Sequence, residues 1–74
     1  MIILSSLEKD QTAIVHSLAG GQRFVSRASA MGFIPGTPVT MVQNIGKGPV
    51  IVYLRDTQVA LGHLEATRIQ VERS

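Results

Sequence analysis

Hydrophobic residues in this chain follow two spacings. Short runs rich in β-branched and apolar residues favour strands and are separated by glycines, prolines and polar residues. They cover Ile2 to Leu7, Thr12 to Leu18, Val39 to Gln43, Val50 to Leu54, Gln58 to Leu61 and Arg68 to Glu72. The segment Gln22 to Met31 has helical spacing instead, and Gly62 to Thr67 suggests a single helical turn. Five or six short strands with one inserted short α-helix predict a mainly β fold, a small and partly open barrel.

The helix is expected to end at a sharply defined exit. Gly32 follows the last helical residue and precedes apolar Phe33, which is typical of a helix closed by a left-handed glycine. Pro35 cannot continue a helix, and Pro35-Gly36 suits the two central positions of a type II turn. We therefore expect Gly32, Pro35 and Gly36 to be structural turn residues that join the helix to the next strand.

Length and composition set the broad class. A chain of 74 residues is too short for two cores, and its 45% hydrophobic content is ample for folding, so residues 1–74 should form a single domain. No apolar run approaches the roughly 18 residues of a membrane span. The opening Met1 to Leu4 is also too short for the apolar part of a signal peptide. A cytoplasmic protein without direct membrane insertion is therefore the expectation.

Charge argues against nucleic acid as a partner. Seven basic residues are dispersed among five acidic ones, for a net charge of +2. Nucleic-acid binding favours a basic run, or basic residues interleaved with several aromatic ones for stacking. The chain has only three aromatic residues, two Phe and one Tyr, so we expect no nucleic-acid partner.

The sequence shows no catalytic pattern. It contains no cysteine, and neither His16 nor His63 lies in a nucleophile motif, so we assign no catalytic residue and expect no enzyme. Imidazole and carboxylate groups do bind divalent transition metals, and Glu65 is close to His63 in the sequence. However, no pair has the three- or four-residue spacing of a preformed helical site. We assign no metal ligand and no cofactor, which leaves weak binding of Fe²⁺ or another divalent transition metal open.

A shallow groove for another protein is the remaining candidate surface. Met31, Phe33 and Ile34 lie beside Arg27 at the helix exit. Turn residues would hold these side chains at low entropic cost, and the Arg27 guanidinium offers five donors to a partner carboxylate or carbonyl. Burial in the core is the simpler interpretation for Met31 and Phe33, whereas Ile34 is the least obliged to be buried. The hypothesis is a partner-binding site formed by Arg27, Met31, Phe33 and Ile34.

These residues also carry a resemblance to a known family. Arg27-x-x-x-Met31-Gly32-Phe33-x-Pro35-Gly36 resembles the Arg-Leu-x-x-Leu-Gly-Leu-x-Pro-Gly signature of FeoA proteins. Further similar segments follow in the family's order, namely Gly48-Pro49-Val50, Val59-Ala60-Leu61-Gly62 and Glu65-Ala66-x-x-Ile69-x-Val71. The chain departs from the pattern at Ala28, where the family has a bulky Leu, and at Lys9-Asp10, where Pro-Gly is usual.

The resemblance implies an SH3-like barrel, in agreement with the strand pattern. It also implies a small cytoplasmic accessory protein of bacterial ferrous iron uptake that is not an enzyme. Such a protein would act by contact with the cytoplasmic GTP-binding domain of a ferrous iron membrane transporter. The alternative is a metal-responsive SH3-like module, either a regulator-type domain or a direct iron carrier. A nucleic-acid-binding barrel is a further alternative.

Overall fold

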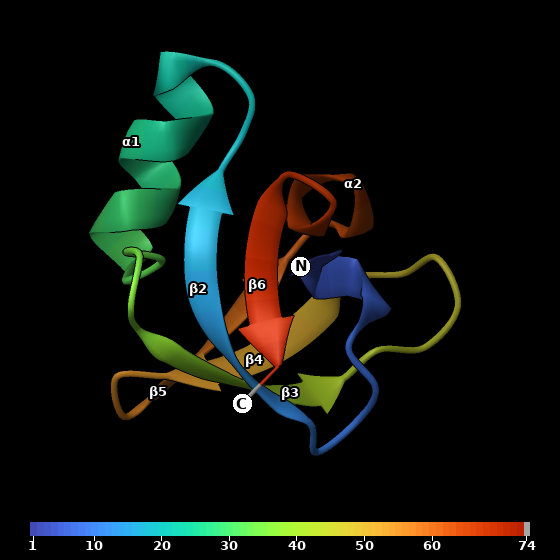
Figure 1. The fold of residues 1–74 in the computed structure, drawn as a ribbon. Helices are drawn as coiled ribbons and strands as arrows, with labels where there is room; N and C mark the ends of the chain where they lie inside the picture. The colour runs from blue at the N-terminus through green and yellow to red at the C-terminus, as the bar shows by residue number, and fades with distance from the viewer. Residues whose placement is uncertain (74) are drawn as a thin grey trace.

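The computed structural model describes residues 1–73, and their strands form one antiparallel sheet of six strands (Figure 1). The order across the sheet is β1-β6-β2-β3-β4-β5. The strands are β1 (Ile2–Ile3), β2 (Thr12–Leu18), β3 (Pro38–Gln43), β4 (Val50–Leu54), β5 (Thr57–Leu61) and β6 (Ile69–Arg73). Two helices, α1 (Gln22–Met31) and α2 (His63–Ala66), accompany them. The predicted mainly β class, with one inserted helix and a late helical turn, is confirmed.

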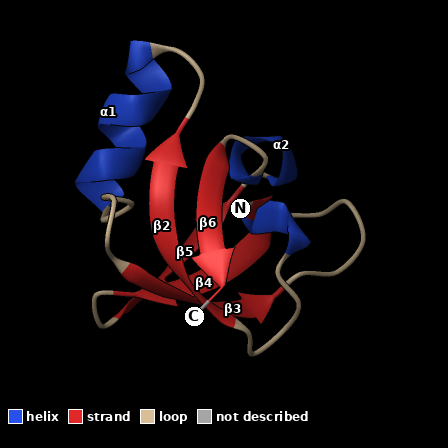
Figure 2. Cartoon of the chain, in the orientation of Figure 1, coloured by secondary structure: helices blue, strands red, loops and turns tan. Residues whose placement is uncertain are grey.

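The sheet folds back on itself to enclose the core. Figure 2 shows β2 and β6 crossing β3, β4 and β5 at a steep angle, with α1 beside β2 and α2 beside β6. Alternate residues of the strands point inward, as expected for a barrel wall. The inward side chains are fully or almost fully buried, and they include Val15, Val39, Met41, Val50, Val52, Leu54, Ile69 and Val71. No polar or charged residue of the described chain is buried.

A bulge interrupts the alternation in β2. Its register against β6 shifts between Val15 and Ser17, so His16 has no counterpart in the pairing. A bulge adds one residue to a strand and bends it locally. His16 is exposed on the outside of the sheet, and Ala13 and Val15 are in the core, as alternation along β2 requires.

The opening segment differs from the expected extended run over Ile2 to Leu7. Only β1 is extended; Leu4–Ser6 forms a 3-10 turn, closed by a hydrogen bond from the Leu7 N–H to the Leu4 carbonyl. The turn places both leucines inward with no exposed area, so the apolar residues do join the core as expected. The Asn44 side chain then fixes the segment by donating to the Ser5 and Leu7 carbonyls, at 2.8 and 2.7 Å.

Helix α1 has the predicted bounds. Its N-cap residue is Gly21, and no side chain caps its first turn. Ten residues without a cap make a marginal helix, so packing must hold it. Phe24 and Ala28 provide that packing because both are buried on the inward stripe, while Arg23 and Arg27 are exposed.

The C-terminal part contains a tight hairpin and the short second helix. Arg55 and Asp56 both have positive φ, 50° and 63°, as a two-residue type I′ turn requires. The turn is one residue shorter than the expected Arg55-Asp56-Thr57, because Thr57 already pairs with Leu54 in β5. Strand β6 then inserts between β1 and β2.

Candidate functional site

The exit of α1 is closed by backbone hydrogen bonds. Gly32 has the left-handed conformation expected from the sequence, with φ of 113°, and its N–H bonds to the Ser29 carbonyl at 3.0 Å. The Phe33 N–H bonds to the Ala28 carbonyl, also at 3.0 Å. This pair of bonds is the Schellman motif, and the burial of Phe33 and Ala28 supplies its usual apolar contact.

Close packing gives Gly32 a second reason to be glycine. A Cβ atom at this position would lie 3.0 Å from Cδ of Arg55 and 3.4 Å from Cδ1 of Leu54. The helix exit therefore sits directly against the β4–β5 hairpin. A larger residue would have to displace the Arg55 side chain as well as adopt an unfavourable φ.

A type II turn follows the helix and is bonded to the sheet. The Thr37 N–H reaches the Ile34 carbonyl at 3.0 Å, and Gly36 has the required positive φ of 95°. Val15 in β2 forms two backbone hydrogen bonds with this turn. Its carbonyl accepts from the Gly36 N–H, and its own N–H donates to the Thr37 carbonyl. Backbone hydrogen bonds therefore fix the helix exit both at the end of α1 and at the turn that follows it.

The four side chains proposed for partner binding lie at different depths. Phe33 has no exposed area, and Met31 is half-buried and packs against the core. Ile34 is 43% exposed, less than Ile45 at 72% and Leu64 at 77%. Arg27 is exposed as well. A partner could therefore touch Ile34 and Arg27 freely and Met31 in part, whereas Phe33 supports the site from within the core.

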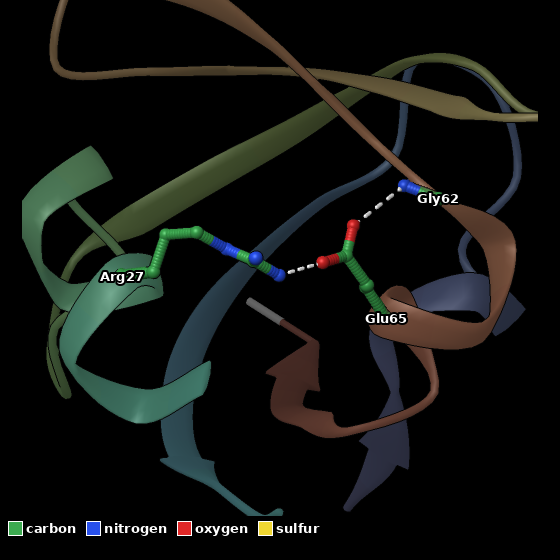
Figure 3. Close-up of polar contacts among 3 residues, drawn as sticks. All are labelled: Arg27, Gly62 and Glu65. Carbon is green, nitrogen blue, oxygen red and sulfur yellow. Dashed lines mark hydrogen bonds and ion pairs between the residues drawn. The ribbon is translucent and has the colours of Figure 1, made fainter. Parts of the chain in front are cut away.

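Arg27 already has a partner within the protein. Figure 3 shows its guanidinium reaching from α1 to Glu65 on α2, where Nη2 forms an ion pair with Oε2. The other Glu65 oxygen, Oε1, accepts a hydrogen bond from the Gly62 N–H at 3.1 Å and closes the start of α2. One carboxylate therefore links the two helices. Nothing in the local sequence pattern pairs residues this far apart in the chain.

An aromatic ring lies between two arginines near this link. The guanidinium carbon of Arg68 is 5.5 Å from the centre of the Phe24 ring, and that of Arg27 is 5.9 Å away. Both distances fall within the range of a cation–π contact. Phe24 is only 5% exposed, so its ring is part of the core as well as a contact of the two arginines. The sequence analysis did not connect Arg68 with this region.

A depression of about 320 Å³ lies beside the β4–β5 hairpin. Residues from the start of β3, including Pro38, and from the β4–β5 hairpin line it. Tyr53 contributes to its wall, is 44% exposed, and donates a hydrogen bond to Asp56 at 3.2 Å. That hydrogen bond and the negative charge of Asp56 raise the pKa of Tyr53 above its usual value. The sequence analysis missed Tyr53, although a tyrosine on the outer face of an apolar strand was a visible signal.

The two histidines do not come together into a metal site. Nδ1 of His16 lies 3.4 Å from Oε1 of Glu72 on β6. Nδ1 of His63 on α2 is buried and has no hydrogen-bond partner. Within residues 1–73, no group of three histidine or carboxylate side chains is placed to hold an ion.

The family assignment follows from comparison with known proteins. A sequence model of the FeoA domain matches residues 2–73, almost the entire chain. The chain belongs to the FeoA family. A crystal structure of an iron uptake regulatory protein (FeoA) superposes with a TM-score of 0.94 at 25% identity, covering 99% of this chain and 97% of the other. FeoA proteins are associated with ferrous iron transport.

Two further structures define the fold. FeoA from Stenotrophomonas maltophilia, solved with zinc, is 30% identical with a TM-score of 0.85. The superposition covers 97% of this chain and 91% of that protein. It is described as a prokaryotic SH3 domain protein, which confirms the SH3-like fold expected for this FeoA chain. A manganese-dependent transcriptional repressor is 16% identical with a TM-score of 0.88; 97% of this chain matches 41% of the repressor and shares its fold.

Two other comparisons gave negative results. No curated protein sequence matches this FeoA chain. Within the described residues, no helix has the length and apolar character needed to cross a membrane.

Proposed function

We propose that this FeoA protein is a cytoplasmic, non-enzymatic accessory protein of bacterial ferrous iron uptake. It acts by contact with the cytoplasmic GTP-binding domain of a ferrous iron membrane transporter. The contact lies at the exit of α1, with Arg27 and Ile34 as the exposed residues. Met31 lies at its edge, and Phe33 supports it from the core.

The geometry of the helix exit supports this proposal. An isoleucine at 43% exposure lies between a Schellman motif and a type II turn, both closed by backbone hydrogen bonds. A partner that buries Ile34 gains apolar area without having to order the chain around it, which favours affinity. The same stretch is part of the sequence by which the chain matches the FeoA family.

Substitution of the two exposed residues tests the proposal. Arg27→Ala and Ile34→Ser should each weaken binding of the transporter's cytoplasmic domain by about 1 kcal/mol or more, the level of an energetic contact. Each should cost less than about 1.5 kcal/mol of folding free energy, because both side chains are largely outside the core. Titration calorimetry with the purified domain measures binding, and a thermal melt of each variant measures stability.

Ile45→Ser is a matched control for Ile34→Ser because it also removes the side chain of an exposed isoleucine, 72% exposed, in the loop between β3 and β4. It should leave binding unchanged. Wild-type affinity in folded Arg27→Ala and Ile34→Ser proteins would show that the exit is only scaffold.

Metal binding is the alternative function and makes a separate prediction. Because neither His16 nor His63 belongs to a group of three possible ligands within residues 1–73, the isolated protein should bind Fe²⁺ or Zn²⁺ no tighter than about micromolar. Anaerobic titration calorimetry checks this. A stoichiometric site tighter than that, lost in His63→Ala, would favour a metal-responsive module instead, with the unpaired Nδ1 of His63 as its first ligand.

A further inference from the structure

The net charge of the protein is concentrated on one face. Arg23 and Arg27 on α1, Arg68 before β6 and Glu65 on α2 form what we call the arginine face. Of the seven basic and five acidic residues in the chain, three basic and one acidic lie here. The four basic and four acidic residues elsewhere cancel. These four residues together carry a charge of +2, equal to the net charge of the whole chain.

Arg23 and Arg27 lower the intrinsic stability of helix α1. Arg23 and Arg27 are four residues apart and hence neighbours on the same helical face, where like charges repel. Arg23 also lies in the first turn, near the positive end of the helix dipole, and that turn contains no acidic residue. Helix stability alone would favour an acidic residue at position 23. An arrangement that opposes local stability is expected at functional sites.

Arg68 is held in place without being neutralised, whereas Arg27 is paired with Glu65. The Cδ atom of Arg68 lies 3.1 Å from the place where a Cβ of Gly20 would be. The aliphatic part of the Arg68 side chain therefore packs against the Gly20 backbone, and its guanidinium contacts the Phe24 ring. Among residues 1–73, Arg23 and Arg68 have no ion pair, and only Arg27 reaches a carboxylate. A cation that is ordered but unpaired loses little entropy when it binds an anion.

We propose that the arginine face docks an acidic protein segment, whose carboxylates pair with Arg68 and Arg23 and compete with Glu65 for Arg27. Planar guanidinium groups form bidentate bonds to carboxylates, and the surplus positive charge steers such a segment onto α1. A nucleic acid fits less well, because the described surface around these arginines offers no exposed aromatic ring for base stacking. The assignment of this segment to the transporter's cytoplasmic domain rests on the proposed function.

A titration of the full chain with a poly-glutamate peptide tests the face directly. NMR signals of the Gly20 and Phe24 amides and of the Arg68 Nε–H should shift at low salt. They should return to their free positions in about 1 M salt, where the screening length is about 3 Å. A poly-glutamine peptide should cause no shift. Absence of shifts with poly-glutamate at low salt would overturn the proposal.

Matched charge variants separate this face from net charge alone. Arg68→Gln should weaken poly-glutamate binding about 5-fold or more, whereas Lys47→Gln, which also removes one charge, should change it less than about 2-fold. Glu65→Gln keeps an oxygen for the Gly62 N–H and removes the competing charge, so binding should tighten about 3-fold. Equal weakening by Arg68→Gln and Lys47→Gln would overturn the proposal, as would tighter binding of duplex DNA than of poly-glutamate.

The transporter domain distinguishes the two proposals. If it binds with an affinity that Ile34→Ser weakens but Arg68→Gln leaves unchanged, the proposed function stands and the role of the arginine face is overturned. If poly-glutamate binds as expected but the transporter domain does not bind at any salt, the arginine face stands and the proposed function fails.

Discussion

The two ends of α1 are held by different forces. At its C-terminal exit, backbone hydrogen bonds and the buried Phe33 fix the chain. Nearer its N-terminus, Arg27 and Arg68 lie against the ring of Phe24, and the Arg27–Glu65 ion pair is partly exposed. Salt screens the second arrangement and leaves the first almost unchanged. Substitution of Gly32 or Phe33, which close the exit, should therefore change stability, whereas substitution of the exposed arginines should mainly change affinity.

Phe24→Ala should have the largest effect because the ring belongs to both the core and the arginine face. Removal of a buried aromatic side chain should lower the free energy of unfolding by about 3 kcal/mol or more. Urea unfolding measures the loss. Phe24→Leu keeps most of the apolar volume and should cost less than about 1.5 kcal/mol while still releasing Arg68. A loss below about 1 kcal/mol for Phe24→Ala would mean that α1 is not held by this ring.

Gly32→Ala tests the exit alone and should have an intermediate effect. The change forces a left-handed φ on alanine and displaces Arg55, so a loss of about 1 kcal/mol or more is expected. Gly46→Ala is the control, because Gly46 also has positive φ, 59°, but open space where its Cβ would lie. It should cost less than Gly32→Ala in a thermal melt. Equal and negligible losses of stability in the two variants would show that the close approach of Gly32 to the hairpin does not matter for stability.

Tyr53 gives the smallest effect and a pH-dependent one. Its pKa in the folded protein is raised above the usual 10.0 by Asp56, so the folded state holds the phenol proton more tightly than the unfolded state. This contribution to stability is complete below pH 10.0 and is lost as pH rises through the higher folded pKa. Ultraviolet titration of the phenolate should give a midpoint above 10.0, and Asp56→Asn should lower it. An unchanged midpoint in that variant would contradict the hydrogen bond.

Local patterns predicted most of the fold because they depend on nearby residues. The bounds of α1, the left-handed Gly32 and the strand Val50–Leu54 all follow from periodicity and from the backbone preferences of glycine and proline. The 3-10 turn at Leu4–Ser6 does not. An apolar run fits either an extended or a helical core segment, and here the Asn44 amide, far away in the chain, selects the turn.

The candidate sites were less predictable because they combine distant residues. Arg27 was expected to be free for a partner, yet its carboxylate partner, Glu65, lies 38 residues away. Arg68 likewise reaches Phe24 only through the pairing of β6 with β2. Whether a large apolar residue is buried also depends on tertiary packing, which separates Phe33 in the core from Ile34 at the surface. This difference agrees with the expectation from the sequence, in which Ile34, between the helix cap and the turn, was the residue least obliged to be buried.

The position of β6 has a consequence for the synthesis of the protein. This last strand lies between the first two, and Val71 pairs with both Ile2 and Val15. A ribosome makes the chain from the N-terminus, so β1 and β2 emerge long before the strand that joins them. The barrel must therefore close after translation of β6, in a late step dominated by contacts between distant parts of the chain. Until then, the edges of β1 and β2 remain open to chaperones or to other nascent chains.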